Sequence, residues 1–219
     1  MALGFISAVA RVRRIPRHPP KAERNFFIVD ASFFANKYLP IGNAPTNEEQ
    51  EQIRKAHQWW KEIDAQISNE RARVYVPDLC IAEAFKVLAK KYYSGAFSSS
   101  TAFKLARDRL SADVSLSHRE LQSQKRYIKY HDIPASRDII VAVGRFYGLF
   151  MKHNCNVGVI DLIIVSTAKY LMDFHDTKRK QIHIITHDNA LWRGTKKVPE
   201  VPNAYDPAQQ TDGFSRVFR

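Results

Sequence analysis

The chain has 219 residues, a formal net charge of +12 at pH 7 and a pI of about 9.8. Its composition, 45% hydrophobic and 26% charged, is typical of a globular domain and excludes the fibrous and fully disordered classes. No apolar run approaches the roughly 20 residues of a membrane-spanning helix, and two cysteines are too few for a secreted disulfide scaffold.

Residues 1–24 form a basic segment, which we expect to be a flexible arm. Six Lys or Arg residues and one Glu give it a charge of +5, which leaves +7 for the rest of the chain. Lys and Arg bind polyanions by releasing counterions from phosphates, so nucleic acid is the expected partner and an acidic membrane surface the alternative. The segment lacks a secretory signal pattern, and a transit peptide over 1–14 is the alternative to the arm. The two cysteines favour a reducing, cytoplasmic location.

The first half of the chain alternates between strand and helix patterns. The apolar run 26–29 predicts a buried strand that ends at Asp30. Thr46, with Glu49 three residues later, predicts a capping box at a helix start. In chain order we expect a strand at 26–29, a helical turn to 34, a helix at 46–67, a strand at 73–76 and a helix at 79–93.

The second half begins with two helices rich in Lys and Arg, at 98–112 and 117–129, which form a predicted helical insertion at about 96–130. Ser136 is expected to cap a long apolar helix. The remaining expected elements are a strand at 127–133, helices at 136–153 and 159–172, a charged loop at 173–180, a strand at 182–185 and an irregular tail at 198–219.

This alternation predicts an α/β fold, with three α/β/α layers and a central parallel sheet, over residues 25–197. In such sheets ligands gather at the carboxyl ends of the strands. One domain with an insertion suits the length of the chain.

Four acidic residues fall where strand ends and helix starts should converge. Asp30 ends the first strand, and Glu83 lies one turn into the helix after the second strand. Asp161 starts the late apolar helix and Asp188 follows the last long strand. Clustered like charges repel unless a hard divalent cation such as Mg²⁺ or Mn²⁺ offsets them. The alternative is that each acid is a cap, a turn residue or a solvated helix residue.

Each acid lies in a short segment of apolar and small polar residues. These are Ile28-Val29-Asp30-Ala31-Ser32, Val76-Pro77-Asp78-Leu79-Cys80-Ile81-Ala82-Glu83, Asp161-Leu162-Ile163-Ile164-Val165-Ser166-Thr167-Ala168 and Ile184-Ile185-Thr186-His187-Asp188. In this order, over about residues 26–195, they resemble the PIN-domain family.

That resemblance implies a PIN-like, Rossmann-like fold, bound Mg²⁺ or Mn²⁺, and endonucleolytic cleavage of RNA. It implies Asp30, Glu83, Asp161 and Asp188 as the catalytic and metal-binding set, with Ser32 and Thr186 at polar positions beside them. It also implies a possible homodimer. The long gap between Asp161 and Asp188 departs from the compact toxins of the family, which are held by an antitoxin protein.

Several basic residues are candidates for substrate binding. Lys86 and Lys90 follow Glu83 on the same helix, and Arg193 and Lys196 follow Asp188. The alternative for each is a solvated charged surface. His187 is expected at the surface, at a strand end. We expect Cys80 to be a small buried hydrophobic residue.

Other function classes remain beside the metal-dependent endoribonuclease. A haloacid-dehalogenase-type phosphatase requires a second Asp two positions after the first, where this chain has Ser32. The open alternatives are a toxin with an antitoxin partner, a housekeeping RNA-processing nuclease, and a catalytically weak PIN-like module that binds RNA or acts as a scaffold.

Overall fold

A five-stranded, all-parallel sheet forms the centre of the computed structural model, which describes residues 24–114, 130–209 and 211–218. The strand order is β3-β2-β1-β4-β5. The parallel α/β prediction is therefore confirmed. The strands are β1 Asn25–Val29, β2 Ala72–Pro77, β3 Tyr130–Ile133, β4 Ile182–Ile185 and β5 Ala204–Tyr205.

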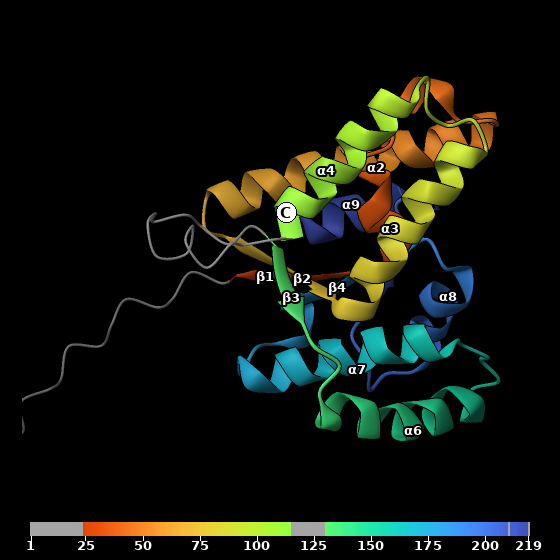
Figure 1. Ribbon diagram of the computed structural model, residues 1–219. Helices are drawn as coiled ribbons and strands as arrows, with labels where there is room; N and C mark the ends of the chain where they lie inside the picture. Colours follow the sequence, from red (N-terminus) through yellow and green to blue (C-terminus); the bar gives the residue numbers. More distant parts are fainter. Residues whose placement is uncertain (1–23, 115–129, 210, 219) are drawn as a thin grey trace, which may run out of the picture.

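Helices cover both faces of the sheet, which confirms the three-layer prediction. In Figure 1, α6 and α7 lie on one face, and α2, α3, α4 and α9 lie on the other. No helix in the described residues is long and apolar enough to cross a membrane. The helices are α1 Ala31–Asn36, α2 Asn47–Ser68, α3 Asp78–Tyr93, α4 Ser100–Val114, α6 Arg137–Lys152, α7 Val159–Phe174, α8 Asn189–Lys197 and α9 Thr211–Val217, with short 3-10 turns at Ile41–Asn43 and Arg179–Gln181.

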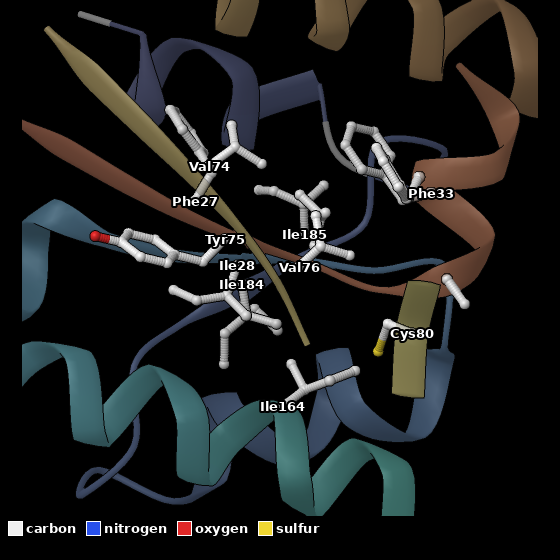
Figure 2. Packing of buried hydrophobic residues seen from close by; sticks show 14 of the residues in the cluster. Phe27, Ile28, Phe33, Val74, Tyr75, Val76, Cys80, Ile164, Ile184 and Ile185 are labelled. Carbon is white, nitrogen blue, oxygen red and sulfur yellow. The ribbon is translucent and has the colours of Figure 1, made fainter. Parts of the chain in front are cut away.

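The central strands are buried on both faces because helices cover them from both sides. Residues paired across the strands share a face: Ile28 stands beside Tyr75 and Ile184. Figure 2 shows these three side chains pointing toward α7, while Phe27 and Val74 point to the opposite side of the sheet. This two-sided burial explains why residues 26–29 of β1 are a continuous apolar run and why all four residues of β4, His183 included, are buried.

Two predicted helix caps differ from the structure. The Thr46 hydroxyl accepts a hydrogen bond from Glu49 N at 3.2 Å, but the Glu49 carboxylate bonds the Lys91 Nζ at 2.5 Å, so only half of the capping box forms. Ser136 occupies the N-cap of α6 without a side-chain capping bond. Its buried hydroxyl has no hydrogen-bond partner among the described residues.

The expectation of an irregular C-terminal tail is wrong. Residues 204–205 form β5, which pairs in parallel with β4 at Ile184 and Ile185. Val198 and Val201 are fully buried, so burial of apolar side chains fixes this segment to the sheet. The strand was not predicted because two residues are too few to show the alternation of apolar and polar side chains that indicates a strand. The predicted helix at 117–129 and almost all of the basic arm lie outside the described residues.

A close contact between α8 and α6 requires the glycine at position 194. A Cβ there would lie 2.7 Å from Phe150 Cε1, whereas a Cβ at Gly148 meets nothing within 4 Å. We expect Gly194→Ala to lower the free energy of unfolding by about 1–3 kcal/mol through overpacking. Gly148→Ala, the control inside α6, should raise it by about 0.5–1 kcal/mol. Urea unfolding followed by circular dichroism measures both, and equal stability of Gly194→Ala and the parent would contradict the contact.

Candidate functional site

The four acids predicted from the sequence line one cleft of about 400 Å³ in the structure. They come from segments that are distant in the chain and lie next to the carboxyl ends of β1, β2 and β4 or at the start of α7. The cleft is lined by Asp30, Ala31, Ser32, Asn36, Gln52, Glu83, Val87, Lys91, Ile160, Asp161, Ile164, His187 and Asp188.

Asp30 is buried at the base of the cleft, where it is 8% exposed. As the N-cap of α1, its Oδ1 accepts a hydrogen bond from Phe33 N at 2.6 Å. Its Oδ2 accepts bonds from the Thr186 hydroxyl at 2.5 Å and from His187 N at 3.0 Å. These bonds fix the carboxylate between β1 and the end of β4.

Asp188 is the N-cap of α8 and shares a partner with Asp30. Its Oδ1 accepts a bond from Leu191 N at 2.8 Å, and its own N donates to the Thr186 hydroxyl at 2.8 Å. Thr186 therefore links the two acids. Thr186 is fully buried and hydrogen-bonds both acids, so it is a positioning residue.

Asp161 and Glu83 reach the cleft from two helices. Asp161 is the third residue of α7 rather than its N-cap, and its Oδ2 accepts a bond from Gly158 N at 3.2 Å. Glu83 lies in the second turn of α3, and its carboxylate has no hydrogen bond or ion pair within the described ranges. Helix capping therefore explains the positions of Asp30 and Asp188. All four acidic side chains nevertheless line the same cleft.

The electrostatics of the cleft show the cost of this arrangement. Burial raises the pKa of Asp161 to about 7, with further increases from the charges of Asp188, Asp30 and Glu83. Burial also raises the pKa of Asp30, although His187 and the hydrogen bonds from its neighbours partly offset this. A cation in the cleft would relieve the repulsion.

The donor chemistry of the cleft fits a hard divalent cation, which prefers carboxylate oxygens. However, the part of the chain that the structure describes contains no group of three or more His, Cys, Asp or Glu side chains placed closely enough to hold a metal ion. Three or more of these side chains would have to lie closer together than they do here to share one ion.

The predicted basic residues lie outside the cleft lining. Lys86 and Lys90 are exposed on α3, whereas Lys91 lines the cleft on the same helical face as Glu83 and Val87. The i, i+4, i+8 spacing of these three residues is the sequence signal that identifies Lys91. Arg193 and Lys196 are exposed on α8, and Lys196 Nζ stands 3.8 Å from the centre of the Trp192 ring.

His187 is not the surface residue that the sequence suggested. Its side chain is 4% exposed, and its Nδ1 lies 3.1 Å from Asp206 Oδ1. Its Nε2 is buried and has no partner in the described chain. Asp206 comes from the C-terminal segment after β5, so the sequence gave no local signal for this pair.

Comparisons with known proteins give a distant likeness in fold. No family model and no curated protein matches the sequence. The crystal structure of FitAcB from Neisseria gonorrhoeae is similar over 84% of this chain and 99% of that chain, at 12% sequence identity and a TM-score of 0.49. VapBC2 from Rickettsia felis, bound to a promoter DNA fragment, is similar over 83% and 98%, at 9% identity and a TM-score of 0.47. These likenesses are too distant to assign the chain to a family.

Two further polar residues in the cleft were not expected from the sequence. Asn36 ends α1, and Gln52 lies on α2. Asn36 lies six residues after Asp30, a separation that places it at the far end of a short helix. Cys80 is fully buried and burial raises the pKa of its thiol, as expected for a hydrophobic role.

Proposed function

We propose that the protein is a divalent-metal-dependent endoribonuclease of the PIN type, which hydrolyses RNA phosphodiester bonds. The observation that supports this best is the meeting of Asp30, Glu83, Asp161 and Asp188 in one cleft at the edge of a parallel sheet. Their sequence contexts resemble those of the family in the same order. The net positive charge of the chain favours RNA as the partner.

The acidic set would hold Mg²⁺ or Mn²⁺. When bound, such an ion supplies a water of lowered pKa and offsets charge on the scissile phosphate. Thr186 keeps Asp30 and Asp188 oriented through its two hydrogen bonds. Ser32, exposed at the cleft beside Asp30, is placed to bind a phosphate oxygen or a water molecule. The exposed Arg193 and Lys196 on α8 would bind RNA backbone outside the cleft.

A second candidate is a catalytically weak PIN-like module that binds RNA or acts as a scaffold. One observation favours it: the described residues contain no preformed group of metal ligands.

Among nucleases, a toxin would be held by an antitoxin protein and a housekeeping enzyme would not. Copurification of the chain with a small partner protein that blocks its activity would favour the toxin role; a homodimer is compatible with both roles.

Incubation of the purified protein with a structured RNA pool tests the proposal. We expect cleavage with Mg²⁺ or Mn²⁺, none with EDTA, and losses of at least about 100-fold in Asp30→Asn and Asp188→Asn, because such ligand changes remove charge stabilisation at the phosphate. Asp138→Asn, in the exposed first turn of α6, is the control and should cut normally. Equal cleavage by the parent and both cleft variants, or cleavage that resists EDTA, would overturn the metal-nuclease proposal.

A further inference from the structure

The acidic cleft has a second end, where amide and amine side chains replace carboxylates. Asn36, Gln52 and Lys91 line it. Asn36 ends α1, whose N-cap is Asp30, so the helix rise places them about 9 Å apart. On α3, which packs against α1, Glu83 and Lys91 are separated by about 12 Å. Both helices therefore run along the cleft, from the carboxylates to this second end.

The amide of Asn36 is unusual because it is buried and unpaired. Asn36 is 5% exposed, and no hydrogen bond to its side chain exists within residues 24–114, 130–209 and 211–218. Neither of its amide atoms is among the fully buried polar atoms that lack a partner. The small exposed surface of Asn36 therefore includes the amide, and it opens to the cleft that this residue lines. The amide therefore has no partner in the described chain and is accessible from the cleft, so it is available to hydrogen-bond a ligand there.

The surroundings indicate an uncharged ligand. Lys91 Nζ is bonded to Glu49 Oε1 at 2.5 Å, so its charge is already neutralised. Gln52 is half-buried, and its amide likewise makes no hydrogen bond to the described chain. Among the described residues that line this end, a second phosphate would find no uncompensated cation. A flat group with hydrogen-bond donors and acceptors along one edge suits the two amides.

Apolar side chains also line the cleft. Val87 lies one turn after Glu83 and one turn before Lys91 on α3, and Ile160 and Ile164 flank Asp161 on α7. A nucleobase has apolar faces and a polar edge, and Asn and Gln pair with base edges through two hydrogen bonds. The cleft volume of about 400 Å³ is in the range that encloses a single small ligand.

We propose that Asn36 and Gln52 are specificity-determining residues that read the edge of one unpaired nucleobase, next to the phosphate at the acidic end. The inference rests on the proposed function for the identity of that phosphate. An unpaired base is required because base edges are accessible to side chains in single-stranded RNA. The protein therefore selects a base at the cut, with the amide of Asn36 as the main determinant.

Mapping of cleavage sites on a random single-stranded RNA pool tests this inference, for the parent, Asn36→Leu, Gln52→Leu and Asn43→Leu. Asn43 is exposed in the 3-10 turn before α2 and serves as the matched control. We expect the parent and the control to prefer one base by at least about fivefold. Asn36→Leu should flatten that preference, and Gln52→Leu should weaken it. Melting temperatures show whether each variant folds. If Asn36→Leu does not fold, Gln52→Leu still tests the inference.

A binding measurement separates the failure of this inference from that of the proposed function. Fluorescence polarisation gives the affinities of labelled A, C, G and U pentaribonucleotides for Asp161→Asn, with and without Asn36→Leu. If both amide variants cleave RNA with the base preference of the parent, the inference is overturned and the proposed nuclease function stands. Binding preferences that Asn36→Leu removes support the inference even if the parent does not cut. Affinities equal for all four pentamers, without cleavage, overturn both.

Discussion

Asp161→Asn is expected to raise the free energy of unfolding of the metal-free protein by about 1–3 kcal/mol at pH 8. Burial and the neighbouring acids raise the pKa of Asp161 to about 7, so its ionised form is a cost to the fold at this pH. The rise of the Asp161 pKa from 3.8 to about 7 corresponds to roughly 4 kcal/mol, and solvent screening at a half-buried carboxylate reduces this energy. The lost interaction with the α7 dipole, about 0.3–1 kcal/mol, is smaller.

The pH dependence of this gain has a definite sign. The folded-state pKa of Asp161 lies above its unfolded value, so protonation stabilises the fold as the pH falls from about 7 toward 4. The advantage of Asp161→Asn should therefore be largest at pH 8 and disappear near pH 4. Urea unfolding in EDTA measures it, with the exposed Asp138→Asn as control. A loss of stability in Asp161→Asn at pH 8 would show that the ionised Asp161 is not a cost to the fold.

Thr186→Val is expected to destabilise the protein by about 3 kcal/mol and to reduce cleavage strongly. The fully buried Thr186 hydroxyl donates to Asp30 Oδ2 and accepts from Asp188 N. Valine has the same shape, but it leaves Asp188 N without its acceptor and removes one of the two hydrogen bonds to Asp30 Oδ2, at about 1–3 kcal/mol each. It also removes a bond that lowers the pKa of Asp30. Denaturant unfolding and the RNA assay measure the two effects.

The matched control is Thr167→Val. Thr167 is also fully buried, but its hydroxyl has no hydrogen-bond partner in the part of the chain that the structure describes. Removing an unsatisfied buried hydroxyl is neutral or stabilising, so this variant should match or exceed the parent in stability. Similar losses in both variants would mean that shape, and not the link between Asp30 and Asp188, determines the effect of Thr186→Val.

The sequence predicted the elements whose burial leaves a clear pattern. A helix was expected at 159–172. In the structure α7 begins at Val159, as expected, and continues to Phe174. Helix α8 was missed because its nine residues contain few apolar side chains and a glycine that packs on Phe150. Strand β5 was missed because pairing with β4, and not local preference, holds it in place.

The acidic set was predictable because parallel strands deliver their carboxyl ends to one edge of a sheet, so Asp30 and Asp188 had to approach one another. The remaining parts of the site depend on packing between distant segments. How α3 rotates against α1 decides which of its faces lines the cleft; once Glu83 faces it, the helical spacing places Lys91 there rather than Lys86 or Lys90. The burial of His187 depends on Asp206, which reaches it from beyond β5.

Binding of Mn²⁺, followed by electron paramagnetic resonance at pH 7.5, tests most directly whether the four carboxylates act together as a site for a divalent cation. We expect the parent and Asp138→Asn to bind Mn²⁺ with equal affinity, and Asp161→Asn and Asp188→Asn to bind it at least about tenfold more weakly. Unchanged Mn²⁺ affinity in both cleft variants would show that the shared cleft is not a metal site.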